Sequence, residues 1–192
     1  AYIVGYPDST VRPQNGITRA EVATIFFRLL DEDVRSDYLT TYNTFPDVNA
    51  DYWANTAIST MASLVVINGR NSGLFDPDAY ITRAEFAAIC ARFDDSNVSG
   101  FDSFTDTFGH WAEEEIGRAA ALGWIQGYDD GTFRPNNPIT RVEVTAIVNN
   151  MLGREADVDF VTEHYDELNH FSDLAVNHWG YYHIVEATND HD

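Results

Sequence analysis

The chain is poor in cysteine and in basic residues, and each shortage excludes a class of protein. Its 192 residues include one cysteine, so no disulfide framework can form. Lysine and arginine total 11 against 31 aspartates and glutamates, which gives a formal charge of −20. Such a field favours solubility and repels nucleic acid and anionic lipid, so we expect neither as a partner. An anionic ligand would have to be held by locally concentrated arginine.

Long apolar runs are also missing. No stretch approaches the length of a transmembrane helix and no signal peptide begins at Ala1, so we expect no membrane insertion. The chain begins and ends abruptly, as a piece of a longer protein would. Cys90 lies among Phe86, Ile89 and Phe93 at helical spacing, which favours a buried structural thiol over a nucleophile.

The sequence shows neither a catalytic constellation nor a metal-ligand spacing. Acidic pairs such as Glu113 and Glu115 arise freely in so acidic a chain, so no glycosidase pair stands out. The histidines with no metal-binding pattern are His110, His164, His170, His178 and His183. Phosphate loops and nucleophile motifs are absent as well. We therefore expect a non-enzymatic segment without metal or cofactor.

What the chain does contain is a repeat. The motif Ile-Thr-Arg-x-Glu opens an apolar helical pattern three times, and each copy follows a glycine-rich turn that ends in proline. Two full copies span residues 45–93 and 104–152. Their motif isoleucines, Ile81 and Ile139, lie 58 residues apart, and their tryptophans have the same spacing. A chain built in this way is typical of a repeat-based binding module.

The two ends each carry half a copy. Residues 1–30 match only the second half of the repeat, and residues 171–192 match only the first half. We therefore expect an all-α domain of three helix-loop-helix repeats in a pseudo-threefold arrangement, in which the terminal halves dock and complete one unit. The alternative is a fragment of a longer array, in which both halves would expose an apolar face. The polar stretches 31–44, 94–103 and 155–170 are predicted to be surface connections, the last with a short helix.

The repeated motif has the composition of a helix capping box. Threonine at the N-cap and glutamate three residues later satisfy each other's backbone N–H groups. We assign this structural role to Thr18, Glu21, Thr82, Glu85, Thr140 and Glu143.

The motif arginine needs a separate explanation. At the first helical position a cation opposes the helix dipole, which costs roughly a few tenths of a kcal/mol. An anion bound by the guanidinium and free helix N–H groups would offset this cost. A salt bridge to a neighbouring aspartate is the alternative, although it does not explain the repeated position. We expect Arg19, Arg83 and Arg141 to lie at the surface and bind an anion, so that alanine there weakens binding and leaves the fold nearly intact.

The turns before the motif supply further candidate contacts. Glycine allows close backbone approach, and the residue after it can stack or hydrogen-bond. The candidate ligand-binding residues in the turns are Gly5, Tyr6, Gly69, Gly127 and Tyr128. We interpret Trp53, Trp111 and Trp179 as packing anchors between units rather than as sugar platforms.

Taken together, these motifs resemble the S-layer homology family. The resemblance rests on the aromatic-x-Asp start, the Trp-Ala helix, the Gly-Tyr-x-Asp-Gly-Thr-Phe-x-Pro turn and the Ile-Thr-Arg-Ala-Glu helix. It implies an extracellular, pseudo-threefold module that anchors a bacterial surface protein to the cell wall. The implied ligand is secondary cell-wall polysaccharide, often with a pyruvylated terminal sugar, which the motif arginine contacts. Self-association in a surface layer is left open.

The central copy departs from this pattern. Arg70 replaces the tyrosine of its turn, and Asp76 stands where the other copies have Arg12 and Arg134. We expect its groove to bind more weakly or not at all, and hence Arg83 to matter least of the motif arginines.

A calcium-dependent protein-interaction module is the alternative function, suggested by acidic turns between helices. A calcium loop needs oxygen ligands at alternate positions and a closing glutamate. The turns at residues 7–9, 71–73 and 129–131 do not follow this pattern, so we favour the anchor.

Overall fold

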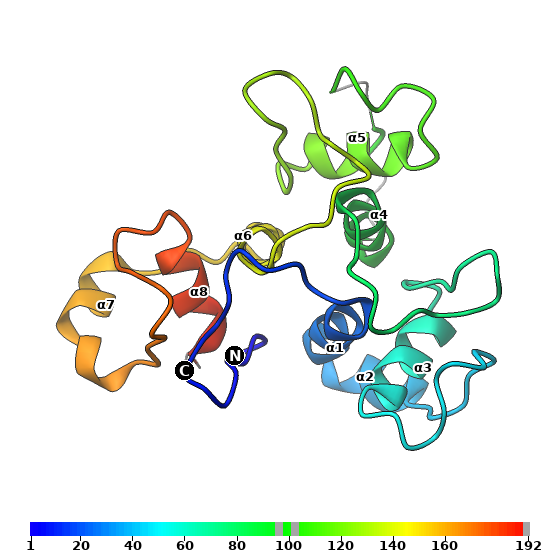
Figure 1. Cartoon of the computed structure of the whole chain (residues 1–192), viewed down its shortest axis with the longest axis horizontal. Helices are drawn as coiled ribbons and strands as arrows, with labels where there is room; N and C mark the ends of the chain where they lie inside the picture. The colour runs from blue at the N-terminus through cyan, green and yellow to red at the C-terminus, as the bar shows by residue number, and fades with distance from the viewer. Residues whose placement is uncertain (95–97, 101–103, 190–192) are drawn as a thin grey trace.

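The computed structural model describes residues 1–94, 98–100 and 104–189. Over these residues the chain forms α-helices and one 3-10 helix and no β-strand, which confirms the predicted all-α class. The helices are α1 (Arg19–Leu29), α2 (Glu32–Tyr38), α3 (Asn55–Ser63), α4 (Arg83–Phe93), α5 (Glu113–Ala121), α6 (Arg141–Leu152), α7 (Val158–Glu163), the 3-10 helix η1 (Tyr165–Glu167) and α8 (Tyr181–Thr188). Figure 1 shows them in three lobes, formed by α1 to α3, by α4 and α5, and by α6 to α8.

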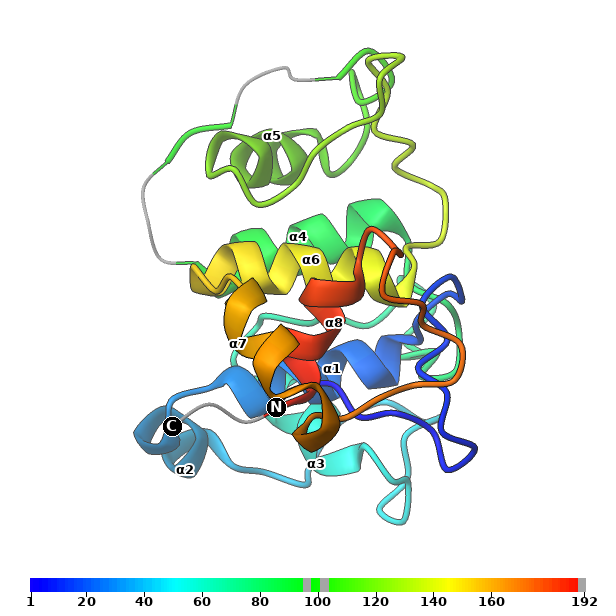
Figure 2. The same cartoon turned by 90° about the vertical axis from the view of Figure 1, so that its left-hand side faces the viewer.

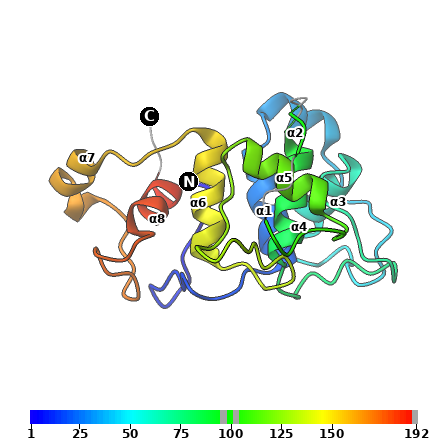
Figure 3. The same cartoon turned by 90° about the horizontal axis from the view of Figure 1, so that it is seen from above.

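Each lobe pairs a motif helix with the tryptophan-bearing segment of the following copy. Helix α1 packs on α3, α4 packs on α5, and α6 packs on α8. In Figure 2, α5 lies above α4 and α6, and α1 and α3 lie below them. Figure 3 shows the lobe of α6 to α8 at one end of the molecule and that of α1 to α3 at the other. Helix packing therefore crosses the boundaries of the sequence copies.

All three motif helices begin with a capping box. The hydroxyls of Thr18, Thr82 and Thr140 accept the backbone N–H of the glutamate three residues later, at 3.2, 3.2 and 3.4 Å. Each glutamate carboxylate in turn accepts the backbone N–H of its threonine, at 2.8, 2.9 and 2.8 Å. Local sequence is thus sufficient to fix where these helices begin.

Replacing a capping threonine is expected to destabilise the protein without changing its fold. Thr82→Ala or Thr140→Ala should lower the free energy of unfolding by roughly 0.5–2 kcal/mol, because the N–H of the third helical residue loses its acceptor. Thr140→Ser is the matched control, since serine keeps the hydroxyl and should retain most of the stability. Urea denaturation of the three variants measures the effect, and equal midpoints for alanine and serine would contradict the capping role.

The three motif segments meet at the centre of the molecule. Ile17, Ile81 and Ile139 are at most 1% exposed. Their backbones form a closed series of hydrogen bonds, in which Ile17 N–H donates to Ile139 at 3.4 Å, Ile81 N–H to Ile17 at 3.0 Å, and Ile139 N–H to Ile81 at 3.1 Å. The isoleucine of the motif therefore joins the copies, and the residues after it are brought close to the neighbouring copy.

The two ends of the chain contact each other. The carboxylate of Asp173 accepts the backbone N–H groups of Val11 and Arg12, at 2.9 and 2.7 Å. The N–H of Tyr2 donates to the carbonyl oxygen of Ala187 at 2.9 Å. The terminal segments are therefore not detached, and the contact that docking of the two half-copies requires is present.

The aspartate of each aromatic-x-Asp start accepts hydrogen bonds from a turn in which one residue has an unusual backbone conformation. Arg12, Asp76 and Arg134 have φ angles of 51°, 56° and 58°, in the left-handed region that is uncommon for residues with a side chain. Asp47 and Asp106 bond their turns as Asp173 does, each accepting two successive backbone N–H groups at 2.7–2.9 Å. Burial acts to raise the pKa of Asp47, but these N–H donors outweigh it and the pKa is lowered.

The predicted connections differ in their contents. Residues 155–170 hold α7 and η1, in agreement with the short helix expected there. Residues 31–44 also hold a helix, α2, which was not expected; none of its residues is buried, and its acidic first turn suits a helix N-terminus. The connection 94–103 includes residues 95–97 and 101–103, which lie outside the described residues.

The buried apolar side chains form one hydrophobic cluster that draws on all three lobes. Cys90 is fully buried in it, and burial raises the pKa of its thiol, as expected for a structural cysteine. Among the helices of the described residues, none has the length and apolar character that a membrane span needs.

Candidate functional site

Three grooves occupy corresponding positions in the three copies. Each is lined by a motif arginine, the capping glutamate of the next motif helix, the glycine turn before that helix, and a tryptophan. We name each groove after the residue that follows the turn glycine. The Tyr6 groove has Arg141, Glu21, Gly5, Tyr6 and Trp53; the Arg70 groove has Arg19, Glu85, Gly69, Arg70 and Trp111; the Tyr128 groove has Arg83, Glu143, Gly127, Tyr128 and Trp179. Their volumes are about 160, 440 and 350 Å³, respectively. The eight ligand-binding candidates predicted from the sequence are thus distributed over the three grooves.

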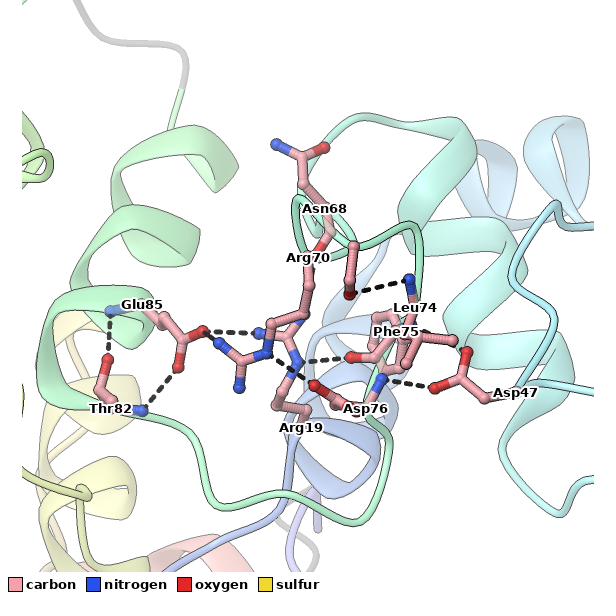
Figure 4. Close-up of polar contacts among 10 residues, drawn as sticks. Arg19, Asp47, Asn68, Arg70, Leu74, Phe75, Asp76, Thr82 and Glu85 are labelled. Carbon is pink, nitrogen blue, oxygen red and sulfur yellow. Dashed lines mark hydrogen bonds and ion pairs between the residues drawn. The ribbon is translucent and has the colours of Figure 1, made fainter.

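The expectation that the motif arginines lie at the surface is wrong, because each is only 5% exposed. In the Arg70 groove, the Nε group of Arg19 donates to the carbonyl oxygen of Phe75 at 2.8 Å, and Nη2 donates to that of Asn68 at 2.7 Å. Its Nη1 group donates to the carboxylate of Glu85 at 3.1 Å (Figure 4). The same three bonds recur in the other two grooves. These buried bonds give the arginine a structural role in every copy.

The arginines and capping glutamates link the copies in a closed series of ion pairs. The pairs are Arg19 with Glu85 at 3.1 Å, Arg83 with Glu143 at 2.8 Å, and Arg141 with Glu21 at 3.0 Å. The salt-bridge alternative considered from the sequence named an aspartate, whereas the partner is the glutamate that caps the next motif helix. Burial lowers the pKa of Arg19, while the charge of Glu85 opposes the shift, and the guanidinium stays protonated.

The N–H groups at the helix starts are not free for an anion, which corrects a second expectation. In α1, the N–H groups of Arg19 and Ala20 donate to the carbonyl oxygens of Ala79 and Pro77 in the next copy, both at 3.0 Å. The third N–H, that of Glu21, donates to the capping hydroxyl. Helices α4 and α6 have the same bonds. Any anion in the grooves must therefore be held by side chains and not by the helix N-termini.

Each motif arginine contacts the turn of the following copy rather than its own. Arg19 bonds the turn that contains Asn68 and Arg70, whereas Arg83 bonds the carbonyl oxygen of Gln126, at 3.2 Å, in the turn of the last copy. The altered turn of the central copy therefore lines the Arg70 groove, whose motif arginine is Arg19 and not Arg83. The reason given from the sequence for Arg83 to matter least does not hold.

Tyrosine in the turn is enclosed by charged groups. The guanidinium groups of Arg12 and Arg141 lie 3.9 and 4.9 Å from the centroid of the Tyr6 ring, and the Tyr6 hydroxyl donates to Glu21 at 3.0 Å. Burial is the main cause of the raised pKa of Tyr6, which keeps the hydroxyl protonated. Tyr128 has the same surroundings, with Arg134, Arg83 and Glu143. These rings present a fixed polar edge to their grooves.

The turn glycines are required by packing within the protein. A Cβ atom on Gly5, Gly69 or Gly127 would lie only 2.2, 2.5 or 2.4 Å from the ring of Phe171, Phe45 or Phe104, respectively. The aromatic residue of each aromatic-x-Asp start therefore explains the glycine. The predicted close approach of backbone to ligand is not needed to account for it.

The interpretation of the tryptophans as packing anchors is wrong. Trp53, Trp111 and Trp179 are 63%, 58% and 58% exposed, and each lines a groove. Each ring lies against the aromatic residue before it, with centroids 5.9, 5.6 and 5.9 Å apart. A signal for this was present in the sequence, because each tryptophan precedes the helix and stands outside its apolar face. The tryptophans are therefore groove residues that sequence reasoning missed, as are Arg28 and Arg92.

The acidic turns use their oxygens internally. In the turn of the last copy, Asp130 accepts the N–H and the hydroxyl of Thr132, at 3.0 and 2.6 Å, and pairs with Arg134 at 3.1 Å. These bonds, those of Thr132 first, lower the pKa of Asp130 to about 2. In the described part of the chain, no cluster of three or more histidine, cysteine, aspartate or glutamate side chains could hold a metal ion.

Comparison with known proteins identifies the family. The S-layer homology domain matches residues 2–23, 44–87 and 103–145, which together make up more than half of the chain. The chain belongs to the S-layer homology family. Family membership makes it a non-catalytic module of extracellular cell-surface proteins, of the kind that anchors them to the cell wall.

Three relatives illustrate where such modules occur. The chain is 38% identical to a cellulosome-anchoring protein of Acetivibrio thermocellus over 192 residues, which covers 97% of this chain and 41% of that protein. It is 36% identical over 209 residues to cell surface glycoprotein 1 of the same organism, covering 100% of this chain and 8% of the relative. The S-layer protein sap of Bacillus anthracis is 30% identical over 139 residues, covering 71% and 16%. The chain thus spans less than half the length of each relative.

Proposed function

We propose that the three grooves bind an anionic secondary cell-wall polysaccharide, with a pyruvylated sugar as the charged group, and so hold a surface protein on the wall. The observation that carries this proposal is the recurrence, in every groove, of a fixed guanidinium beside an exposed tryptophan. Carbohydrate has apolar ring faces that pack on an indole, and a ketal-linked pyruvate is a carboxylate that pairs with arginine.

The distribution of charge supports an anionic ligand. Among the described residues, six of the 11 basic side chains of the protein line the grooves, whereas only three acidic side chains do so. The six are Arg19, Arg28, Arg70, Arg83, Arg92 and Arg141. Arginine is therefore concentrated at the grooves of a protein that otherwise repels anions.

The buried arginines can serve structure and ligand together. A guanidinium has five N–H groups, of which three are bonded to described residues in Arg19, Arg83 and Arg141. The two that remain, one on each Nη nitrogen, are donors for a carboxylate in the groove. Because the internal bonds already fix the side chain, binding costs little further conformational entropy.

Sedimentation with purified cell walls tests the proposal. The protein is expected to pellet with untreated walls, less with walls whose pyruvate has been removed by mild acid, and not with walls stripped of the polysaccharide. Unfolded protein serves as the control for nonspecific adhesion. Binding that survives removal of the polysaccharide would contradict the proposal. The alternative, a calcium-dependent interaction module, predicts loss of binding in EGTA, which the polysaccharide anchor does not.

A further inference from the structure

The three grooves differ in the number of guanidinium groups that line them. The arginines are Arg19, Arg70 and Arg92 in the Arg70 groove, Arg28 and Arg141 in the Tyr6 groove, and Arg83 in the Tyr128 groove. One capping glutamate lines each groove. The differences arise at two repeat positions: the residue after the turn glycine, and the last turn of the motif helix, where Asn150 corresponds to Arg28 and Arg92.

Arg70 adds a guanidinium to its groove because the central copy has different residues at three repeat positions, whose summed charge is the same in every copy. In the other copies a tyrosine lines the groove, and the arginine whose guanidinium lies over its ring pairs with an aspartate four residues earlier, at 3.0 or 3.1 Å. In the central copy the tyrosine, aspartate and arginine positions hold Arg70, Ser72 and Asp76. The three positions carry no net charge in any copy. Only in the central copy does the cation stand on the groove wall, with the anion, Asp76, outside the lining.

Arg70 and Arg19 form an adjacent pair of cations. The Nη1 groups of both bond the same oxygen of Glu85, at 2.5 and 3.1 Å, and Nε of Arg70 bonds Asp76 at 3.1 Å (Figure 4). The Nη2 group of Arg70 is bonded to none of the described residues, and the side chain is 34% exposed. Arg92, on the same groove, has a 4.0 Å contact to Glu115 as its one ion pair with the described residues. Donors from three arginines therefore remain available in one groove of about 440 Å³.

From this arrangement we propose that the Arg70 groove is the strongest anion site of the three and prefers a doubly charged group, a phosphorylated sugar, over the single carboxylate that suits the other two grooves. The inference rests on the proposed function of the grooves. Three guanidinium groups and one carboxylate line this groove, because Asp76 and Glu115, which pair with Arg70 and Arg92, lie outside the lining. This excess of cations on the groove wall suits a dianion, and phosphate accepts hydrogen bonds from several arginines at once. The turn of the central copy was expected from the sequence to weaken its groove. In this proposal the Arg70 groove, which that turn lines, binds anions most strongly.

Titration with matched hexoses tests the preference groove by groove. The ¹⁵N indole resonances of Trp53, Trp111 and Trp179 report one groove each. At pH 7.5, above the second pKa of a phosphate ester near 6, glucose 6-phosphate is a dianion, glucuronate a monoanion and glucose a neutral control. Glucose 6-phosphate is expected to bind at Trp111 with a Kd at least about tenfold lower than at the other two tryptophans, and about tenfold lower than glucuronate at Trp111. Equal values at all three, or no preference for phosphate at Trp111, would overturn the proposal.

A triple exchange supplies the matched variant. Arg70→Tyr with Ser72→Asp and Asp76→Arg gives the central copy the residues of the other two and leaves the charge of the protein unchanged. The Kd for glucose 6-phosphate at Trp111 is expected to rise about tenfold, while the values at Trp53 and Trp179 stay constant. An unchanged Kd at Trp111 in a folded variant refutes the role of Arg70.

A second variant covers the case in which the exchange impairs folding. Arg92→Asn copies Asn150 at an exposed position and is expected to weaken phosphate binding at Trp111 about threefold, so an unchanged Kd counts against the proposal.

The wall-sedimentation assay distinguishes failure of this inference from failure of the proposed function. If the protein still sediments with walls while glucose 6-phosphate shows no preference for the Arg70 groove reported by Trp111, the inference fails and the proposed function stands. If walls do not pellet the protein, the proposed function itself fails.

Discussion

Arg19→Ala, Arg83→Ala and Arg141→Ala are each expected to lower the free energy of unfolding by about 3–5 kcal/mol, the usual cost of removing one partner from a buried ion pair. Each change deletes a guanidinium that is 5% exposed. In α1, for example, it leaves two backbone carbonyl oxygens without their arginine donor and removes one of the donors to Glu85. Chemical denaturation followed by tryptophan fluorescence measures the loss.

Two further variants make the comparison specific. Arg154→Ala removes an exposed arginine and is expected to change stability by less than about 0.5 kcal/mol. Arg141→Lys keeps the charge but not the planar fork of donors, so it should fall between wild type and Arg141→Ala. Denaturation midpoints of the alanine variants that match the Arg154→Ala control would show that the closed series of ion pairs contributes nothing to the fold.

The features that the sequence predicted correctly depend on local interactions. The all-α class follows from apolar periodicity within single helices, and the helix starts follow from threonine and glutamate three residues apart. The buried environment of Cys90 could also be read from its own helix. In each of these cases the atoms that decide the outcome lie within one helix or one turn of the residue concerned.

The features that could not be predicted depend on distant partners. Arg19, at the start of an isolated helix, would be exposed; it is buried because Glu85, 66 residues later, and the turn of the next copy enclose it. The partners of Arg141 are separated from it by 120 residues or more, because they belong to the N-terminal half-copy whereas Arg141 lies in the last full copy. The assignment of each arginine to the turn of the following copy likewise emerges only when the copies pack together.

The arginine variants are expected to lose stability, so they cannot isolate the role of the grooves in binding. Variants of the groove tryptophans can, because these side chains are exposed. Trp111 is 58% exposed, so Trp111→Ala should leave the free energy of unfolding within about 0.5 kcal/mol of wild type. Removal of an aromatic anchor from a binding site costs about 2 kcal/mol or more, about a thirtyfold loss of affinity. Binding of a wall-polysaccharide fragment at the Arg70 groove is therefore expected to weaken by at least that factor.

Calorimetric titration of the fragment into Trp111→Ala should reveal one site fewer at high affinity than in wild type. Phe108→Ala is the matched control, because Phe108 is 86% exposed on the loop that precedes Trp111 and lines none of the three grooves. It should bind the fragment as wild type does.

The combined variant Trp53→Ala, Trp111→Ala and Trp179→Ala should fail to sediment with walls while keeping a cooperative unfolding transition, because avidity is lost when every groove is weakened. If this folded triple variant still pelleted with walls, the attachment would have to use a surface other than the grooves.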